Sequence, residues 1–331
     1  MNTLLKTPLS PFACAALVAI SSLAATSVLA AFPERAVTMI VPFAAGGPTD
    51  TLARSIAQSM TGALKHTVII ENVVGAGGTL GAERVARAKP DGYVVLLHHI
   101  GMATSPALYQ KLRFKPMEDF APIGLVADVP MTLVARGNFP AADFAQALSY
   151  IKANKDKISY ANAGIGSASH LCGMLFQTAI ATDLTTVPYK GTGPAMNDLL
   201  GGQVDIMCDQ TTNTSQQIKS GKIKVYGVTT RTRVPSLKAV PTLDEQGLKG
   251  FEVAVWHGIY APKGTSKEAI DALVAALQTA LQDATVKVRL ADLGTEPVAK
   301  NRATPEALQT HLKAEIEKWS PLIRKAGVYA D

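Results

Sequence analysis

Several features that would point directly to a function are missing from this sequence. The 331 residues include only three cysteines and contain no CxxC, HxxH or HExxH spacing, so a metal site has no support. Lysine and arginine are scattered, and no basic patch is interleaved with aromatic residues, which argues against nucleic acid as a partner. The formal net charge of +6 is a mild excess, which suits an anionic small molecule better.

Phosphate-binding motifs are also absent. No GxxxxGK[ST] sequence occurs, and the glycine loop at residues 75–80 lacks the third glycine of a dinucleotide fingerprint. About twenty residues further on, where that fingerprint places an acid for the ribose, residues 95–97 are apolar. We therefore predict no nucleotide, no other cofactor and no metal.

The first thirty residues have the pattern of a secretory signal peptide. Lys6 is the only charged residue before Glu34, an apolar segment follows Lys6, and small residues lead up to Ala30. The apolar run is shorter than the ~20 residues that a membrane anchor needs, and no later run reaches that length. We expect export to the periplasm with cleavage near Ala30.

Short apolar runs alternate with helical patterns along most of the remaining chain. Strands are predicted near residues 37–41, 67–70, 93–97, 131–135, 158–160, 185–187, 204–207 and 224–228. Helices are predicted between most of them and at the C-terminal end, but not at residues 98–130 or 208–223. Strand–helix–strand steps of this length predict an α/β fold built from βαβ units. The length favours two domains.

Two cysteines lie beyond the signal peptide. Cys172 falls inside a predicted helix and Cys208 ends a predicted strand, so both look like small buried apolar residues. An oxidising compartment permits a disulfide between them. We expect free thiols.

Four strand ends run into loops of small residues, each followed by a helix. These loops span residues 43–50, 75–79, 163–169 and 190–194. Ligands of open α/β sheets bind beyond the carboxyl ends of the strands, and the first N–H groups of a helix bind anions without any basic side chain. Glycine also serves simply to make tight turns, but four such loops together predict an anion site.

The third of these loops contains Ser167, and His170 follows it directly, which suggests a second interpretation. A secreted serine hydrolase using this pair is the alternative, because catalytic triads are recognised by geometry rather than by sequence spacing. However, Ser167 does not lie in a GxSxG elbow, and serine is the ordinary N-cap of a helix. No acid is singled out as a third member.

Histidines and aspartates beside the loops are further candidates. His98 and His99 close a predicted strand and His170 lies in the first turn of a helix, so these imidazoles are placed to face a ligand or to make structural hydrogen bonds. Asp50 and Asp209 are expected to hold loops in place, since a carboxylate opposite an anionic ligand repels it.

A series of short motifs follows one order along the chain. They are FPER at 32–35, IVPF at 40–43, GAGG at 75–78, PDGY at 90–93, GIGSASHL at 164–171, PYKG at 188–191, GGQVD at 201–205 and WHG at 256–258. With them the chain resembles the periplasmic solute-binding proteins of tripartite tricarboxylate transporters, the Bug or TctC-like family. The resemblance covers essentially the whole mature sequence.

The resemblance implies a two-lobed Venus-flytrap fold of type II-like kind, with a mixed sheet flanked by helices in each lobe. Residues 31–132 and 255–331 would form lobe 1, and residues 133–254 would form lobe 2. Such a protein performs no catalysis. It captures a small organic carboxylate between the lobes and delivers it to the membrane permease subunits of its transporter, and we expect a monomer. A sensor subunit that presents its ligand to a membrane receptor is a further alternative.

By resemblance, one lobe holds a ligand carboxylate with residues 43–50 and the other with residues 163–170. The predicted ligand-binding residues are Phe43, Ala44, Ala45, Gly46, Gly47, Thr49, Asp50, His98, His99, Ala163, Gly164, Gly166, Ser167, His170, Tyr189 and Asp209. No catalytic residue is predicted.

Two departures from the family pattern bear on the ligand. The loop after Leu97 is usually rich in serine and threonine, but here it reads HHIGM at residues 98–102. Met174 stands where the family usually has a glutamate. Because imidazole and thioether groups suit a bulkier ligand, we predict an aromatic carboxylate such as terephthalate or a benzoate.

Overall fold

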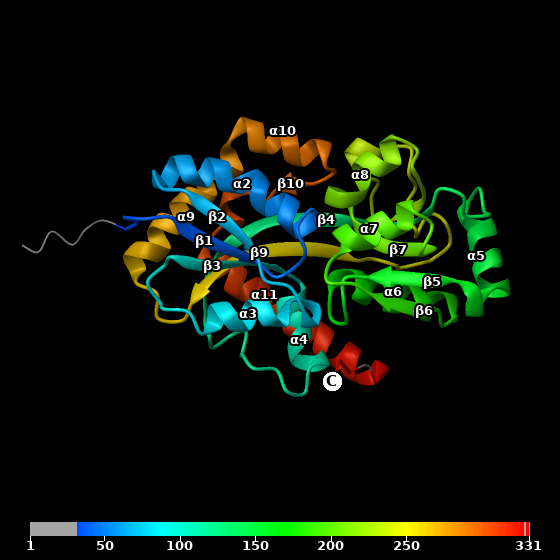
Figure 1. Cartoon of the computed structure of the whole chain (residues 1–331), viewed down its shortest axis with the longest axis horizontal. Helices are drawn as coiled ribbons and strands as arrows, with labels where there is room; N and C mark the ends of the chain where they lie inside the picture. The colour runs from blue at the N-terminus through cyan, green and yellow to red at the C-terminus, as the bar shows by residue number, and fades with distance from the viewer. Residues whose placement is uncertain (1–31, 328, 331) are drawn as a thin grey trace, which may run out of the picture.

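The computed structural model describes residues 32–327, 329 and 330, so the predicted signal peptide lies outside the described residues. Two α/β lobes lie side by side and share one sheet, with strand order β2-β1-β3-β9-β4-β7-β5-β6 (Figure 1). The first lobe contains β1 (Val37–Val41), β2 (Val68–Asn72), β3 (Val94–His99), β9 (Ala254–Pro262) and the first part of β4 (Phe120–Arg136). The second contains the end of β4, β5 (Ser159–Asn162), β6 (Thr185–Pro188), β7 (Ile206–Gln210) and β8 (Ile223–Val228). We call these lobe 1 and lobe 2.

The long strand β4 joins the two lobes. It pairs with β9 of lobe 1 as far as Pro130, and with β7 and β8 of lobe 2 from Met131 and Thr132 onward. The chain returns to lobe 1 just before β9, where the Val253 N–H donates to the Thr229 carbonyl. The lobes are therefore connected by extended backbone that is hydrogen-bonded on both sides of the crossing.

In lobe 1, helices cover both faces of the sheet (Figure 1). One layer contains α2 (Pro48–Leu64), α9 (Lys267–Gln282) and α10 (Ala284–Asp292), and the other contains α3 (Thr79–Ala86), α4 (Gly101–Leu108) and α11 (Pro305–Ala326). Strands β2, β1 and β3, which lie between these layers, run parallel to one another. Their sequences are mostly apolar, as expected for strands buried on both faces. The core is thus centred on β1, β3 and β9.

Lobe 2 is layered in the same way, and β4 shows how. Leu133 and Ala135 belong to the core that includes α5 (Phe144–Ala153) and α6 (Ala168–Ile180). Val134 points to the opposite face and packs in a separate cluster with α7 (Thr192–Leu200). This opposition is expected, because successive side chains of a strand alternate between faces. The short helix α8 (Thr211–Lys219) covers the same face as α7, since its Ile218 packs on that cluster.

The expectation of free thiols is wrong, because Cys172 and Cys208 form a disulfide. The predicted elements are correct: Cys172 lies in α6 and Cys208 in β7. Helix α6 packs directly over β7 and β5, which brings the two Cα atoms to 6.1 Å, within the usual range for a disulfide. Sequence alone does not show that the two side chains point toward each other.

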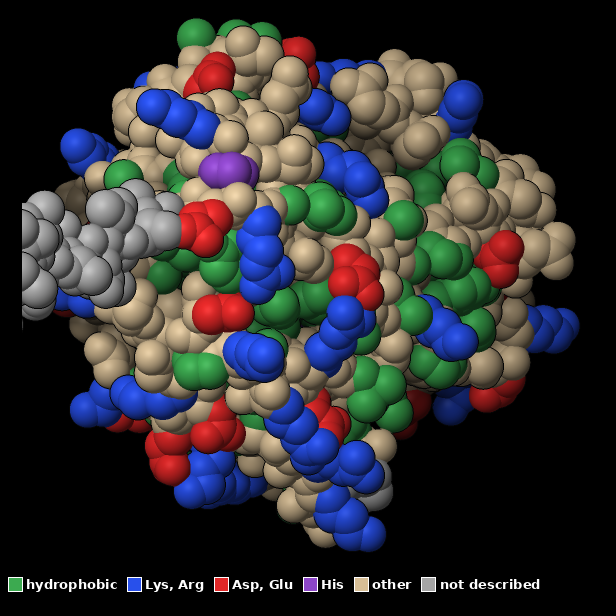
Figure 2. Space-filling model, turned by 60° about the vertical axis from the view of Figure 1, so that its left-hand side comes forward, with side chains coloured by type: hydrophobic (Ala, Val, Ile, Leu, Met, Phe, Trp, Pro, Cys, Tyr) green, Lys and Arg blue, Asp and Glu red, His purple; other side chains and the backbone are tan. Residues whose placement is uncertain are grey.

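The described surface carries both signs of charge. Figure 2 shows lysine and arginine side chains with acidic side chains among them on one face of the molecule. Several ion pairs lie on lobe 1, for example Arg84 with Glu71 and Arg35 with Asp91. Within the described part of the chain, no helix is both long enough and apolar enough to cross a bilayer.

Candidate functional site

The carboxyl ends of β1, β3, β5 and β7 meet where the lobes face each other. There they enclose a cavity of about 10 Å³, roughly the room that one water needs. Its lining residues are Phe43, Pro48, Thr49 and His99 from lobe 1, and Ala163, Ser167, Ala168, Ser169, Thr192, Asp209 and Gln210 from lobe 2. We call it the inter-lobe cavity.

Four helices begin at the inter-lobe cavity. Helix α2 starts there at Pro48, α6 at Ala168 and α7 at Thr192, while Gln210 is the N-cap of α8. The N-terminus of a helix carries partial positive charge and unpaired N–H groups. The lining includes no lysine or arginine, and among the residues that the structure describes no group of His, Cys, Asp and Glu is arranged to hold a metal ion. The cavity therefore favours an anion through backbone groups.

In lobe 1, Asp50 fixes the loop that leads into α2. Its carboxylate accepts hydrogen bonds from the Gly46 N–H (2.9 Å), from Arg54 Nε (2.9 Å) and from Asn72 Nδ2 (3.0 Å). Burial acts to raise the pKa of Asp50, but the hydrogen bonds from Arg54, Gly46 and Asn72 outweigh it and hold the pKa below its usual value. Asp50 is thus an ionised anchor of the loop.

A cluster of rings supports the rest of the lobe 1 wall, and two of its members, Phe43 and His99, line the cavity. Phe43 stacks on His99 with centroids 4.6 Å apart, and the His99 ring meets those of His98 and His257 edge-on. Burial lowers the pKa of all three imidazoles, that of His99 to about 3. These rings are therefore neutral at physiological pH, and they contribute packing and hydrogen bonds rather than positive charge. Thr49 contacts this cluster through His257 Nε2, 3.3 Å from its Oγ1.

In lobe 2, Ser167 caps helix α6. Its Oγ accepts a hydrogen bond from the His170 backbone N–H (3.2 Å) and lies 3.1 Å from Ser169 Oγ. The His170 ring instead accepts from the Gly166 N–H through Nδ1 (3.4 Å), and burial lowers its pKa. Ser167 is thus engaged as a helix cap, and its described hydrogen bonds do not include the imidazole that a catalytic base would supply.

The two lobe 2 segments beside the cavity are tied together. The Cys172–Cys208 disulfide joins α6 to β7. Tyr160 adds a second link, since its hydroxyl donates to the Ser169 carbonyl (2.8 Å) and accepts from the Cys208 N–H (3.1 Å). The start of α6 and the end of β7 are therefore held at a fixed separation.

The lobes touch each other around the cavity. The Ala44 N–H donates to the Lys190 carbonyl across the gap (3.0 Å), and the Tyr109 hydroxyl donates to the Ile165 carbonyl (2.6 Å). A Cβ added at Gly193 would lie 3.0 Å from the Ala45 carbonyl oxygen. The lobes are thus closed, and because the cavity has room for only about one water, they must separate before a ligand enters.

The structure brings six of the sixteen predicted site residues to this cavity: Phe43, Thr49, His99, Ala163, Ser167 and Asp209. Gly164 and Tyr189 line a neighbouring cavity of about 280 Å³, which Phe43 and Ala163 also border. The other eight, Ala44, Ala45, Gly46, Gly47, Asp50, His98, Gly166 and His170, shape the same loops without lining the inter-lobe cavity. Pro48, Ala168, Ser169 and Thr192 lie within the predicted loops 43–50, 163–169 and 190–194 but are not among the predicted site residues, and Gln210 lies outside these loops. Their common signal is their position at the start of a helix.

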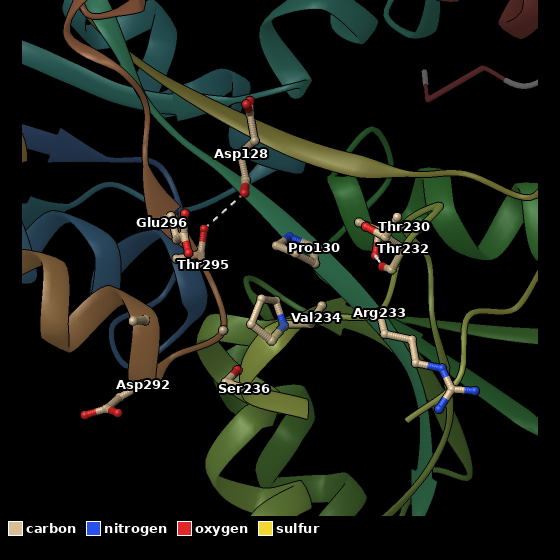
Figure 3. A pocket seen from close by; sticks show the side chains of 13 residues that line it. Asp128, Pro130, Thr230, Thr232, Arg233, Val234, Ser236, Asp292, Thr295 and Glu296 are labelled. Carbon is tan, nitrogen blue, oxygen red and sulfur yellow. Dashed lines mark hydrogen bonds between the residues drawn. The ribbon is translucent and has the colours of Figure 1, made fainter. Parts of the chain in front are cut away.

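A roomier cavity of about 520 Å³ lies at another part of the lobe junction. It is bounded by the middle of β4, by residues 230–236 and by the segment from α10 to the short strand β10 (Glu296–Pro297). Figure 3 shows Arg233 and Asp292 pointing away from its centre, while Thr295 is hydrogen-bonded to Asp128. The single-turn 3-10 helix Pro235–Leu237 begins beside it, but no α-helix does, so this cavity lacks the convergent α-helix N-termini that make the inter-lobe cavity an anion site.

Comparisons with known proteins agree with this picture. Residues 52–328 match the family described as "Tripartite tricarboxylate transporter family receptor". The periplasmic binding protein BugD has 57% identity and a TM-score of 0.88, covering 90% of this chain and 99% of that one. MatC from Rhodopseudomonas palustris, solved with bound malate, has 41% identity and a TM-score of 0.85, covering 88% and 100%. A second protein of that organism, solved with adipate, has 33% identity and a TM-score of 0.85, covering 90% and 99%.

Proposed function

Because this chain belongs to the tripartite tricarboxylate transporter receptor family, we propose that it is a periplasmic solute-binding protein that closes its two lobes over a small organic carboxylate. It is exported by its signal peptide, works as a monomer, performs no chemistry of its own and delivers the ligand to membrane permease subunits. The observation that carries the proposal is the inter-lobe cavity, where four helices begin and no lysine or arginine side chain is present. Such a site selects an anion through backbone N–H groups.

The residues around the inter-lobe cavity narrow the chemical class of the ligand. The aromatic carboxylate predicted from the sequence depends on His98, His99 and Met174, but both imidazoles are buried and pack against Phe43. Met174 packs against the core and does not line the cavity. These contacts favour an aliphatic carboxylate, and the ligands of the malate-bound and adipate-bound relatives are of this kind.

Lobe closure is part of the proposed function. We place the hinge where β4 changes partners and where the chain re-enters β9, so that residues 31–132 and 255–331 move against residues 133–254. Small-angle scattering of the protein with a saturating ligand should then show a smaller radius of gyration than without it. An unchanged radius at saturation would argue against a hinge.

The proposal is tested by calorimetry with a panel of carboxylates. Succinate, malate, adipate and citrate represent the aliphatic class, and benzoate and terephthalate the aromatic class. We expect one-to-one binding of at least one aliphatic member and weaker binding of the aromatic ones. Tight binding of terephthalate alone would instead support the aromatic ligand, and a folded protein that binds no carboxylate would refute the proposed function.

Catalysis by Ser167 and His170, the alternative function, is tested by a separate assay. The purified protein is incubated with simple carboxylic esters, together with a Ser167→Ala variant. We expect no turnover above the spontaneous rate, because the Ser167 hydroxyl accepts from a backbone N–H rather than facing an imidazole base. Turnover that disappears in Ser167→Ala would establish the hydrolase.

A further inference from the structure

One group in the inter-lobe cavity does not suit an anion. Asp209, near the end of β7, lines the cavity and has a residue exposure of only 1%. Its carboxylate accepts a hydrogen bond from the neutral side chain of Asn213 (2.5 Å), and among the described residues no lysine, arginine or histidine forms an ion pair with it. A buried carboxylate without a cation is costly, and facing an anionic ligand it would add repulsion.

A structural role explains only part of this placement. Asp209 lies just before α8, where a negative charge is favourable, and its bond to Asn213 helps to close the first turn of that helix. Besides Asn213, the Thr192 hydroxyl and the Gln210 N–H also lower the pKa of this carboxylate by hydrogen bonding, but a carboxylate offers about four lone-pair sites, so a site remains for a donor of the ligand. Burial raises the pKa of Asp209 to about 6, so the group is mostly ionised at neutral pH and acts as an acceptor.

The next residue, Gln210, is a second buried hydrogen-bond acceptor at the cavity. Gln210 also lines the cavity and is almost fully buried. Its side-chain oxygen Oε1 has no hydrogen-bond partner within the protein, and buried polar atoms normally have one. The end of β7 therefore presents two neighbouring acceptors that no protein donor satisfies in full.

We propose that Asp209 makes the site selective for carboxylates that carry a hydrogen-bond donor, a hydroxyl or an ammonium group, close to the carboxylate. This inference builds on the proposed function. The carboxylate of the ligand lies at the helix N-termini, while its donor meets Asp209 and Gln210. A site built to pair with a polar group rejects an analogue that lacks it, because the buried acceptors are then left without a partner.

Matched ligands test this selectivity. Succinate, malate and aspartate share one carbon skeleton and differ only in having no substituent, a hydroxyl or an ammonium at C2. In calorimetry at pH 7.5 we expect malate or aspartate to bind at least tenfold more tightly than succinate. The comparison is repeated with terephthalate and 2-hydroxyterephthalate, so that the result does not depend on the skeleton.

Substitution of Asp209 provides the second test of this selectivity. In Asp209→Asn, which keeps an oxygen for Asn213 but removes the charge, we expect the preference for the ammonium ligand over succinate to fall at least fivefold. In Asp209→Ala we expect the preference for any donor to fall to about twofold. Succinate itself should bind as well as before or better, whereas a merely structural role for Asp209 would weaken all the ligands together. Asp156→Asn, an exposed position, is the control and should leave every ratio unchanged.

The binding results distinguish a failure of the inference about Asp209 from a failure of the proposed function. Equal binding of donor-bearing and plain dicarboxylates by the unmodified protein would overturn the role of Asp209 and leave carboxylate binding intact. A donor preference that persists undiminished in Asp209→Ala would overturn it as well. Failure of all five ligands to bind the folded protein would count against the proposed function, on which the inference rests.

Discussion

The two walls of the inter-lobe cavity are built in opposite ways. The lobe 1 wall contains the imidazole of His99, and the buried imidazoles of His98 and His257 pack behind it; the pKa values of all three are lowered so that they stay neutral. The lobe 2 wall contains a buried acid, Asp209, whose pKa is raised. Neither wall offers a cationic side chain. The positive potential of the cavity therefore comes from helix N-termini, whereas the side chains determine its shape and select polar groups on the ligand.

The largest expected effect concerns the cross-link in the lobe 2 wall. We expect the double variant Cys172→Ala, Cys208→Ala to lose about 3–4 kcal/mol in the free energy of unfolding, because the disulfide closes a loop of 36 residues in the unfolded chain. Urea unfolding without reductant measures the loss, and the unmodified protein treated with reductant serves as the reference. Equal midpoints for the variant and the oxidised protein would show that the disulfide contributes nothing.

The contact between the walls is tested next. Gly193 packs against the loop at residues 45–47 of the opposite lobe, so a larger side chain would prevent full closure. We expect Gly193→Val to weaken binding of whichever carboxylate binds the unmodified protein by up to about 100-fold, or about 3 kcal/mol. Gly62→Val is the matched control, since nothing lies within 4 Å of a Cβ at that position. If both variants bind equally well, closure at Gly193 is not required.

The lobe 1 wall should be sensitive to acid. The unfolded chain takes up a proton on His99 below its ordinary pKa of ~6.5, whereas the folded protein does so only near 3. Stability is therefore lost as the pH falls below about 6.5, by about 2 kcal/mol at pH 5 for this residue alone. In His99→Gln, the loss in unfolding free energy between pH 7.5 and pH 5 should be smaller by that amount. An identical loss in both proteins would mean that His99 titrates freely in the folded state.

The lobe 2 wall should respond in the opposite direction, with a smaller effect. The pKa of Asp209 is raised to about 6 in the folded protein, so its contribution to stability is present below its ordinary value and lost as the pH rises through about 6. The pKa shift alone corresponds to about 3 kcal/mol, but the amide of Asp209→Asn accepts a weaker hydrogen bond from Asn213 than the carboxylate does. We therefore expect this variant to increase the unfolding free energy by about 1–2 kcal/mol at pH 7.5, and the gain to disappear near pH 4. Destabilisation at pH 7.5 would show that the Asn213 bond outweighs the burial of charge.

Much of the fold can be predicted from the sequence where apolar runs are uninterrupted. The strands at β1, β3, β5 and β7 lie where the hydrophobic pattern places them. The first half of β4 is not predicted, because Pro122, Gly124 and Pro130 interrupt its run of strand-forming residues. Its extended conformation depends on pairing with β9. Helix α8 escapes as well, since its sequence TTNTSQQIK has little apolar periodicity.

The site is predictable to a similar extent. The small-residue loops after strands are visible in the sequence, and they lead to the walls of the cavity. The contributions of Thr192 and Gln210 to the cavity depend on which loops face each other across the gap between the lobes. The order in which strands pair in a sheet cannot be predicted from a local sequence pattern. The pairing of Cys172 with Cys208 has the same origin, since α6 must pack on β7 before the sulfurs meet.

The most direct measurement is a crystal structure of the protein with the carboxylate that binds most tightly in the calorimetric panel. We expect ligand carboxylate oxygens within hydrogen-bond distance of backbone N–H groups in the first turns of α2 and α6, with the lobes closed around them. A ligand found instead in the cavity beside Pro130 and Ser236, or on one lobe alone, would contradict binding between the lobes at the helix N-termini.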